Sequence, residues 1–366
     1  MATRKLLVGL AGLVILAAGA EAAAGSKELK KITLVTNSRV LLPGTANLWV
    51  GKELGYFAEE GLDPDFITSD GASQVIQWLA NGTAQIATIA PDPVLQFAAR
   101  GTKPPVRLVY NFNRGLTNQI AVRPESPVRE VQDLRGKRIG ILSFGHFSYD
   151  YAKFVLRGAG VDPEREATFI AVGQGAPAAL ALYNNQVDAL SLFDVAFISI
   201  EGLGYRLRWL PQPPFIREII AGVSVAVQEE FLRTNRETIA GFLRAITKGT
   251  VWYIYNPEAT VRLHWRMFPE SKPKGKTEEI ALQETVAQLK VRAAYFRKEL
   301  GGTNRYGAFY PPGWEGYARY VGVEGKINVH DLYTNELIDL ANDFDEARVR
   351  QAALNFDAKR LEGPAR

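Results

Sequence analysis

The sequence predicts an α/β protein of two lobes, each a mixed sheet flanked by helices, followed by a helical C-terminal extension. The first reason is an internal repeat, in which one order of turn, apolar run, glycine turn and helix recurs roughly a hundred residues further on. The second reason is length, because 366 residues exceed what a single hydrophobic core usually spans. The third is the region after residue 228, where apolar residues recur with helical spacing.

The repeat occupies residues 61–86 and 160–190. Each copy opens on a Gly-x-Asp-Pro turn, enters an apolar run, reaches a glycine turn at Gly71 or Gly175, and continues as a helix. A tight turn and a second apolar run close each copy, which therefore reads as a βαβ step in which glycine permits a sharp turn. The alternative is that two unrelated connections share similar turn residues. Two such units predict two facing lobes with a small molecule held between them.

Turn residues divide the first part of the chain into short elements. Strands are expected at 32–36, 86–90 and 106–110, and helices at 46–58 and 93–100. A second set begins with a strand at 119–122, which Pro124 and Pro127 end, and a strand at 139–142. Prolines 211, 213 and 214 mark a loop, after which a strand at 219–227 runs back.

This order predicts how the chain is divided. Residues 27–118 plus 228–366 form lobe 1 and residues 119–222 form lobe 2, with hinge strands near 119–122 and 222–227. The extension in lobe 1 is expected to contain helices at 237–255, 277–300, 312–320 and 336–344.

Residues 1–24 predict export. A short positive segment, Thr3-Arg4-Lys5, precedes an apolar core that runs to Ala17, and small residues suited to signal peptidase follow. The apolar core is shorter than the roughly 20 residues that a membrane span needs, although an uncleaved anchor is the alternative. The chain has no cysteine and hence no lipobox. We therefore expect a signal peptide at 1–24 and a periplasmic protein that is soluble, without a lipid anchor and not inserted in the membrane after cleavage.

Composition excludes several classes of protein. The net charge is +4 and the basic residues are scattered, which argues against a nucleic-acid partner. Without cysteine there is no thiol nucleophile and no cysteine-based metal site, and His146, His264 and His330 are isolated. Ser143 lacks the preceding glycine of a nucleophile elbow, and no phosphate-binding loop occurs. We therefore expect no metal, no cofactor and no catalytic residues; these negatives favour a binding protein over an enzyme.

The candidate site lies where strands end and helices begin, because ligands of α/β sheets sit at the carboxyl ends of the strands. Turns at 37–39, 70–73, 143–148 and 173–176 qualify. The last three present helix N-termini, which suit a carboxylate, sulfonate or phosphate; ordinary helix capping is the alternative.

Aromatic and charged residues near these turns leave the charge of the ligand open. Rings there, Phe144 and Phe147 among them, suit a planar ligand; Asp92 and Asp194 could accept from an amino group or cap helices. Arg39 could pair with an acidic ligand or lie on the surface, as could Arg114. The candidate ligand-binding residues are Asn37, Arg39, Trp49, Gly71, Ala72, Asp92, Ser143, Gly145, His146, Phe147, Gly175 and Asp194.

One motif resembles a known family. The stretch 51–63, Gly-Lys-Glu-Leu-Gly-Tyr-Phe-Ala-Glu-Glu-Gly-Leu-Asp, resembles the N-terminal region of periplasmic binding proteins for nitrate, sulfonates, taurine and thiamine-pyrimidine precursors. Segments 71–87, 133–140 and 333–345 are also similar to that group, so the resemblance covers nearly the whole mature chain. It implies a type II binding fold and delivery of a captured solute to the permease and ATPase of an ABC importer.

The resemblance leaves the ligand and one alternative function open. Asp92 and Asp194 favour a pyrimidine-like heterocycle, whereas Arg39 and the helix N-termini favour a sulfonate or carboxylate. We expect the protein to bind its solute as a monomer. Some relatives of this fold are enzymes, including a pyrimidine synthase with a cysteine-rich motif and a desulfinase with a catalytic cysteine. The absence of cysteine argues against both. A periplasmic enzyme acting on a small aromatic or heterocyclic compound is the alternative, and a sensor domain is a further one.

Overall fold

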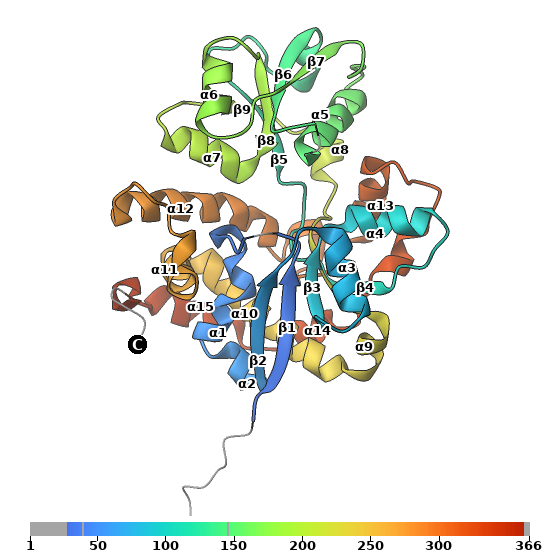
Figure 1. The fold of residues 1–366 in the computed structure, drawn as a ribbon, viewed down its shortest axis with the longest axis vertical. Coiled ribbons are helices and arrows are strands. Elements are labelled where there is room, and N and C mark those ends of the chain that lie inside the picture. Colours follow the sequence, from blue (N-terminus) through green and yellow to red (C-terminus); the bar gives the residue numbers. More distant parts are fainter. Residues whose placement is uncertain (1–27, 39, 145, 362–366) are drawn as a thin grey trace, which may run out of the picture.

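The computed structural model describes residues 28–38, 40–144 and 146–361, and two lobes are visible in it (Figure 1). The expected signal peptide at 1–24, Arg39 and Gly145 lie outside the described residues. Within the described ranges, every helix is too short or too polar to cross a membrane.

The first lobe contains a five-stranded mixed sheet in the order β2-β1-β3-β10-β4. β1 is parallel to β2 and β3, whereas β10 is antiparallel to β3 and β4. The central strands are almost wholly apolar because both faces are covered by helices. The strands are β1 (Lys30–Thr36), β2 (Leu62–Thr68), β3 (Ile86–Ile89), β4 (Val106–Tyr110) and β10 (Ser224–Gln228).

The second lobe repeats this topology with the order β7-β6-β8-β5-β9. β6 is parallel to β7 and β8, and β5 is antiparallel to β8 and to the short β9. The strands are β5 (Asn118–Val122), β6 (Lys137–Ile141), β7 (Ala167–Ala171), β8 (Ala189–Phe193) and β9 (Arg208–Trp209). The predicted fold class, two α/β lobes built from mixed sheets, is therefore confirmed.

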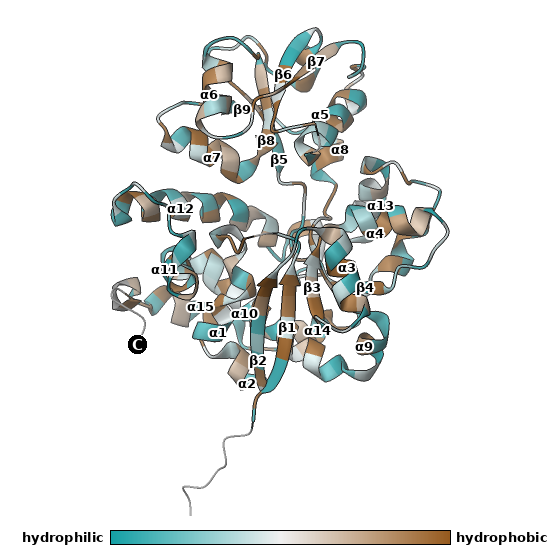
Figure 2. Cartoon of the chain, in the orientation of Figure 1, coloured by the Kyte–Doolittle hydropathy of each residue, from teal (hydrophilic) through white to brown (hydrophobic). Residues whose placement is uncertain are grey.

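Helices cover both sheets, with apolar residues concentrated on the strands and on the inner helix faces (Figure 2). In the first lobe these are α1 (Val50–Glu53), α2 (Tyr56–Glu59), α3 (Ala72–Ala80) and α4 (Pro91–Ala99). In the second they are α5 (Phe147–Gly158), α6 (Ala176–Tyr183), α7 (Asp194–Gly202) and α8 (Pro214–Arg217). The C-terminal extension contributes α9 (Glu229–Thr234), α10 (Arg236–Tyr255), α11 (Pro257–Met267), α12 (Glu278–Arg292), α13 (Pro311–Tyr320), α14 (Ile338–Ala341) and α15 (Glu346–Asn355).

Four expected elements differ from the structure. The helix expected at 336–344 is reduced to the four residues of α14. The helix expected at 46–58 is three short pieces: a 3₁₀ helix (Pro43–Leu48), then α1 and α2. Trp49 separates the first two, and Gly55, with a left-handed φ of 79°, separates α1 from α2. The helix expected at 277–300 ends at Arg292 and continues as 3₁₀ turns. The strand expected at 219–227 starts only at Ser224, because residues 219–223 cross between the lobes instead.

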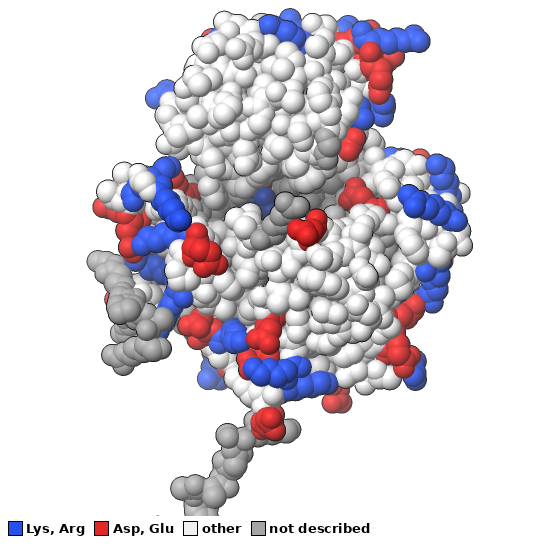
Figure 3. All heavy atoms as spheres, in the orientation of Figure 1, with Lys and Arg blue, Asp and Glu red and all other residues white. Residues whose placement is uncertain are grey.

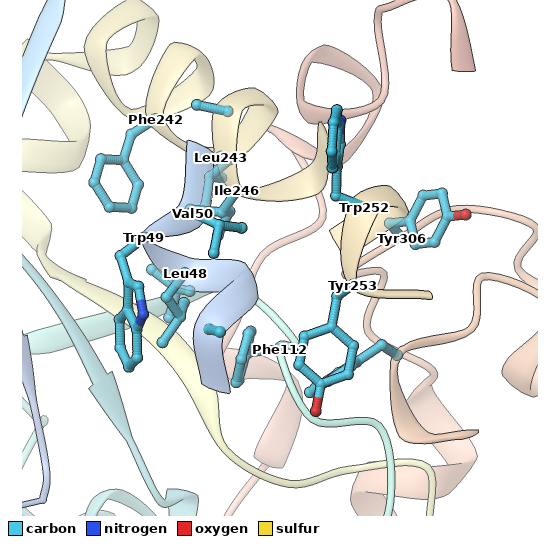
Figure 4. Close-up of a cluster of buried hydrophobic side chains, with 14 of the residues drawn as sticks. Leu48, Trp49, Val50, Phe112, Phe242, Leu243, Ile246, Trp252, Tyr253 and Tyr306 are labelled. Atoms are coloured by element: carbon cyan, nitrogen blue, oxygen red, sulfur yellow. The ribbon is translucent and has the colours of Figure 1, made fainter. Parts of the chain in front are cut away.

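The core of the first lobe joins the start of the chain to the C-terminal extension. Leu48, Trp49 and Val50 pack beside α10, which contributes Phe242, Leu243 and Ile246 (Figure 4). Phe242 also lies 5.1 Å from Phe57 on α2, measured between ring centroids. Burial of these large side chains, at about 1.5–3 kcal/mol each, holds the turn after β1 in place.

Two segments, 111–117 and 219–223, connect the lobes (Figure 1). They lie against each other: the Asn113 amide donates to the Val223 carbonyl at 2.8 Å, and the Asn111 side chain donates to Ile220 at 3.1 Å. Gly222 sits at the point of closest approach, where a Cβ atom would overlap the Asn113 carbonyl oxygen. Only glycine therefore fits there without a backbone shift.

Candidate functional site

The carboxyl ends of the parallel strands in both lobes face the gap between the lobes. β5 begins where the first connection arrives, and it is antiparallel to β8 with Asn118 opposite Phe193. β8 and its parallel neighbour β6 therefore end at the gap. In the first lobe β4 ends at the same connection and is parallel to β3, since both are antiparallel to β10. The surface is hollowed between the two lobes (Figure 3).

The first lobe contributes two linked turns to this cleft. The Ser69 amide donates to Ser38 O at 3.1 Å, and the Ser69 hydroxyl donates to Thr36 O at 2.8 Å, so the turns after β1 and β2 are held together. Gly71 follows with a φ of 137° and precedes Ala72, the first residue of α3. No atom lies within 4 Å of the position of a Cβ atom on Gly71, so its backbone conformation, and not crowding, favours glycine. Asn37 is half-buried beside these turns.

In the second lobe, hydrogen bonds connect the described residues of the turn after β6 to one another and to β8. The His146 Nδ1 atom accepts from the Ser148 amide at 3.1 Å and caps α5. The Ser148 hydroxyl accepts from the Leu142 amide, and Ser191 on β8 donates to Ser148 O at 2.9 Å. Because Nδ1 is an acceptor, the proton of the neutral ring resides on Nε2. Burial lowers the pKa of His146, which favours this neutral form.

Three aromatic side chains are in contact at this turn, His146, Phe147 and Phe193, and Phe144 beside them packs on Tyr149; we call Phe144, His146, Phe147 and Phe193 the aromatic shelf. The ring of His146 lies 4.0 Å from Phe147 at an interplanar angle of 30°, and 5.9 Å from Phe193. Phe144 and Phe147 are 58% and 50% exposed, which is unusual for side chains of this size. Exposed rings beside a neutral imidazole offer a surface on which a planar ligand can stack. The Nε2–H group of His146 adds one hydrogen-bond donor to that surface. Ser143, which precedes the shelf, is half-buried.

The glycine turn of the second repeat corresponds in position to that of the first, although the two glycines differ in φ. Gly175 has a φ of 65° and precedes α6, as Gly71 precedes α3. Both turns leave main-chain N–H groups at the start of a helix, where partial positive charge accumulates.

Asp92 lies in the first turn of α4 and accepts a hydrogen bond from the Tyr317 hydroxyl at 2.7 Å. Burial raises the pKa of the Asp92 carboxyl group, and the charge of Asp150 on α5 of the other lobe raises it further. This carboxylate is therefore positioned by a side chain of the C-terminal extension.

Two predicted site residues have protein partners and no exposed surface in this arrangement. The Trp49 indole donates to His264 Nδ1 at 2.8 Å. Asp194 accepts from Arg292 through both oxygens: Nε–Oδ2 is 2.8 Å and Nη2–Oδ1 is 2.5 Å. That these two side chains contact a ligand stays a prediction.

Three further residues near the cleft did not stand out in the sequence. Arg292 resembles an ordinary cation in the last turn of a helix, and Tyr295 and Tyr317 resemble core aromatics.

Arg114 is buried, and its guanidinium donates to Leu300 O at 2.6 Å and to the Thr303 hydroxyl at 2.8 Å. It therefore stabilises a loop of the C-terminal extension and does not lie on the surface.

The geometry can bind a planar molecule and donate hydrogen bonds to it. In the described part of the chain, no group of three His, Cys, Asp or Glu side chains could hold a metal ion.

Two lobes of the same topology, joined by two connections and facing each other across a cleft, define the periplasmic binding protein fold. A solved structure with this fold, assigned as the periplasmic sulfonate-binding protein SsuA of an ABC transporter from Methylobacillus flagellatus, has a TM-score of 0.58 at 18% identity. The match covers 90% of this chain and 96% of that one.

The model of the NMT1/THI5-like family matches residues 43–260, and the chain belongs to that family. Among its relatives is the riboflavin-binding protein RibY of Chloroflexus aurantiacus, 26% identical over 303 residues, which are 80% of this chain and 82% of RibY. Another relative is an enzyme, the 4-amino-5-hydroxymethyl-2-methylpyrimidine phosphate synthase THI12 of Saccharomyces cerevisiae. It is 23% identical over 256 residues, which are 67% of this chain and 72% of the yeast protein.

Proposed function

We propose that this protein is the periplasmic substrate-binding component of an ABC importer. It captures a small organic solute between its lobes and delivers it to the membrane permease and its ATPase. The observation that carries the proposal is the aromatic shelf, two of whose rings are at least half exposed at the carboxyl end of β6, in the cleft of a two-lobed binding fold. Of the large apolar side chains that are exposed in the described part of the chain, Phe144 and Phe147 are the aromatic ones, and exposed rings close together in the sequence mark a candidate binding surface.

The proposed ligand is a planar nitrogen heterocycle. A flat ring gains contact with Phe147 and Phe193 at little cost in side-chain entropy, and a neutral His146 presents an Nε2–H donor suited to a ring nitrogen or carbonyl. Asp92 adds an acceptor for an amino group from the opposite lobe. The names of the two relatives agree with this class, since riboflavin and the pyrimidine of the yeast synthase are both nitrogen heterocycles.

A sulfonate or carboxylate is the second candidate. The turns at Gly71 and Gly175 precede α3 and α6, and the first main-chain N–H groups of a helix have no carbonyl partner within it. The likeness to a protein assigned as SsuA motivates testing this class. These amides would bind a sulfonate, whereas the aromatic shelf would bind a heterocycle. Substitution of a shelf residue therefore distinguishes the two classes of ligand.

Function in an importer requires that the lobes move and that the protein reaches the periplasm. We assign residues 27–118 plus 228–366 to one lobe and 119–222 to the other. The hinge strands expected near 119–122 and 222–227 lie mostly inside the two sheets, as β5 and β10, so we propose the adjoining connecting segments 111–117 and 219–223 as the hinge. Residues 1–24 act as a cleaved signal peptide. The mature protein works as a monomer without metal or cofactor.

The test is a thermal-shift screen of the purified mature protein with riboflavin, aminopyrimidines, alkanesulfonates, aromatic acids, nitrate and oligopeptides. We expect a heterocycle to give the largest rise in melting temperature. A largest rise with an oligopeptide would contradict the proposed site. A largest rise with a sulfonate or with nitrate would favour the second candidate.

An enzyme on the same scaffold is the alternative, because the yeast relative is a synthase. The chain has no cysteine, and the described part has no cluster of side chains for a metal, so the cleft is proposed to bind without turnover. Mass spectrometry of the bound compound after prolonged incubation tests this: recovery of the compound unchanged is expected, and a product formed in proportion to enzyme and time would contradict it.

A further inference from the structure

Helix α12 belongs to the C-terminal extension but packs along α7 of the second lobe (Figure 1). The Gln288 side chain donates to the Ser199 hydroxyl at 3.2 Å. One turn further along α7, a Cβ atom on Gly202 would lie 3.3 Å from the Glu284 carboxylate, so the two helices are in contact there. The lobes are thus joined by a side contact as well as by the two connecting segments.

The strongest part of this contact is the ion pair of Asp194 and Arg292. The Asp194 side chain is 0% exposed and that of Arg292 is 14% exposed. The guanidinium bonds both carboxylate oxygens, which is the fork geometry that arginine adopts with carboxylates. A desolvated pair of this kind persists only when both partners are held in place, because each charge alone would be costly to bury.

The residues that follow α12 extend this contact towards the first connecting segment. The Gln119 side chain of β5 donates to the Tyr295 hydroxyl at 3.2 Å, and the Arg114 amide donates to Tyr295 O at 2.9 Å. The Arg114 guanidinium then bonds main-chain carbonyls at Arg297 and Leu300. The stretch from Arg292 to Leu300 therefore contacts the second lobe at one end and the connecting segment at the other.

The ion pair lies next to the candidate binding surface. Asp194 directly follows Phe193, the shelf residue at the end of β8, and its amide donates to Thr117 O at 2.9 Å. The position of Asp194 thus fixes the end of β8 and, through the contact of Phe193 with His146, the shelf. At another point between the lobes the contact is between apolar rings: Phe154 on α5 meets Tyr320 on α13 at a centroid distance of 5.0 Å. Apolar surfaces can separate without leaving a buried charge unpaired, whereas separation of Asp194 from Arg292 would leave both charges without their partners.

We propose that Asp194 and Arg292 are positioning residues, whose buried ion pair fixes the second lobe on α12 and holds the aromatic shelf over the first lobe. The lobes then rotate about this contact, and the edge at Phe154 and Tyr320 opens. The proposal rests on the proposed function only where it concerns the ligand; the position of the lobes is measured without one.

The experiment uses the fact that the chain has no cysteine. Cysteines introduced as Thr83→Cys and Arg129→Cys place one dye on each lobe, at exposed positions near the ends of the sheets remote from the cleft. The distribution of inter-dye distances is measured by single-molecule energy transfer in the ligand-free mature protein. The measurement is repeated in the Arg292→Gln variant.

The matched control is Arg138→Gln. Arg138 makes a bidentate pair with Asp188, at 2.9 and 3.1 Å, but both residues belong to the second lobe. We expect Arg292→Gln to broaden the distance distribution and shift it away from the wild-type position, and Arg138→Gln to leave it unchanged. An unchanged distribution in Arg292→Gln, or an equal broadening in the control, would overturn the proposal.

Two additions keep the test decisive. If Arg292→Gln does not fold, Arg292→Lys is measured instead. Lysine keeps the charge but cannot bond both carboxylate oxygens in a fork, so a smaller broadening of the distance distribution is expected, and an unchanged distribution would contradict the proposal.

Riboflavin titration of the same variants should show a roughly tenfold weaker affinity in Arg292→Gln only, within the usual range of conformational coupling. An equal loss of affinity in Arg138→Gln would contradict the proposal. If the wild type does not bind riboflavin, riboflavin is excluded as the ligand, while the distance measurement decides the positioning role by itself.

Discussion

Tyr317 donates a hydrogen bond of 2.7 Å to Asp92, which lies 225 residues earlier in the chain. The pair joins the start of α4 to α13 of the C-terminal extension, at the edge of the cleft. Tyr317 is itself buried, and burial together with the nearby Asp92 carboxylate holds the pKa of its hydroxyl well above the usual range. Tyr317 is therefore always a donor at neutral pH, and Asp92 is held as its acceptor.

The first prediction concerns the pH dependence that Asp92 confers. Its pKa is raised in the folded protein, chiefly by burial, so the folded state binds more protons than the unfolded state between the two pKa values. Stability is thus greatest below the ordinary carboxyl pKa and falls as pH rises through the raised one. Asp92→Asn keeps an acceptor for Tyr317 without the charge. We expect a higher melting temperature for Asp92→Asn than for wild type at pH 8, and no such gain at pH 3.5.

The second prediction concerns acid and His264. Burial lowers the pKa of this histidine from 6.5 to about 3, and its Nδ1 atom accepts from Trp49. The folded state therefore binds fewer protons than the unfolded state in this interval, and stability is lost as pH falls from 6.5 to 3. The loss contributed by this residue approaches roughly 4 to 5 kcal/mol.

His264→Gln tests this, because glutamine does not titrate. We expect the variant to be less stable than wild type at pH 7.5 but to lose less stability between pH 6.5 and pH 4, measured by urea denaturation. Identical pH profiles would show that another group causes the acid sensitivity.

The third prediction concerns the crossing of the two connecting segments. A Cβ atom on Gly222 would overlap the Asn113 carbonyl oxygen and lie 3.0 Å from Gly115 O. Gly222→Ala should therefore destabilise the protein by about 1–3 kcal/mol, the usual cost of overpacking. Gly44→Ala is the control, because nothing lies within 4 Å of its Cβ position and its φ is not left-handed. Equal denaturation midpoints for the two variants would contradict the close approach.

The fold could be predicted largely from local signals. The Gly-x-Asp-Pro turns and the glycines at 71 and 175 mark βαβ steps, and the structure has β2-α3-β3 and β7-α6-β8 at those places. The helix expected at 46–58 was wrong in detail because its apolar residues follow a helical period, while Gly55 breaks the backbone in a left-handed conformation. Hydrophobic periodicity indicates which residues of a helix are buried, but it does not indicate where the helix axis bends.

The surroundings of the candidate site were harder to predict. The sequence indicates which turns follow strand ends, and parallel strands share one carboxyl edge, but that these turns bind the ligand stays a prediction. The partners of Asp194 and Asp92, by contrast, come from 98 and 225 residues away. No local pattern distinguishes Arg292 from a solvent-exposed cation at a helix C-terminus, so the pairing of these side chains required the tertiary structure.

The last prediction concerns the aromatic shelf itself. Phe147 is 50% exposed and stacks on His146, so its ring contributes little to the core and much to the cleft surface. Phe147→Ala should therefore lower the affinity for a planar heterocycle while changing the melting temperature of the ligand-free protein only slightly. A ligand at a hundred times its dissociation constant stabilises the wild type by about 2.7 kcal/mol, and we expect most of that stabilisation to be lost in the variant at the same ligand concentration.

Leu354→Ala on α15 is the matched control, because Leu354 is 51% exposed and belongs to a helix far along the C-terminal extension. Isothermal titration with the compound that gives the largest thermal shift measures both variants. Unchanged affinity in Phe147→Ala would place the ligand away from the shelf, at the helix N-termini of α3 and α6, where a sulfonate or carboxylate would bind.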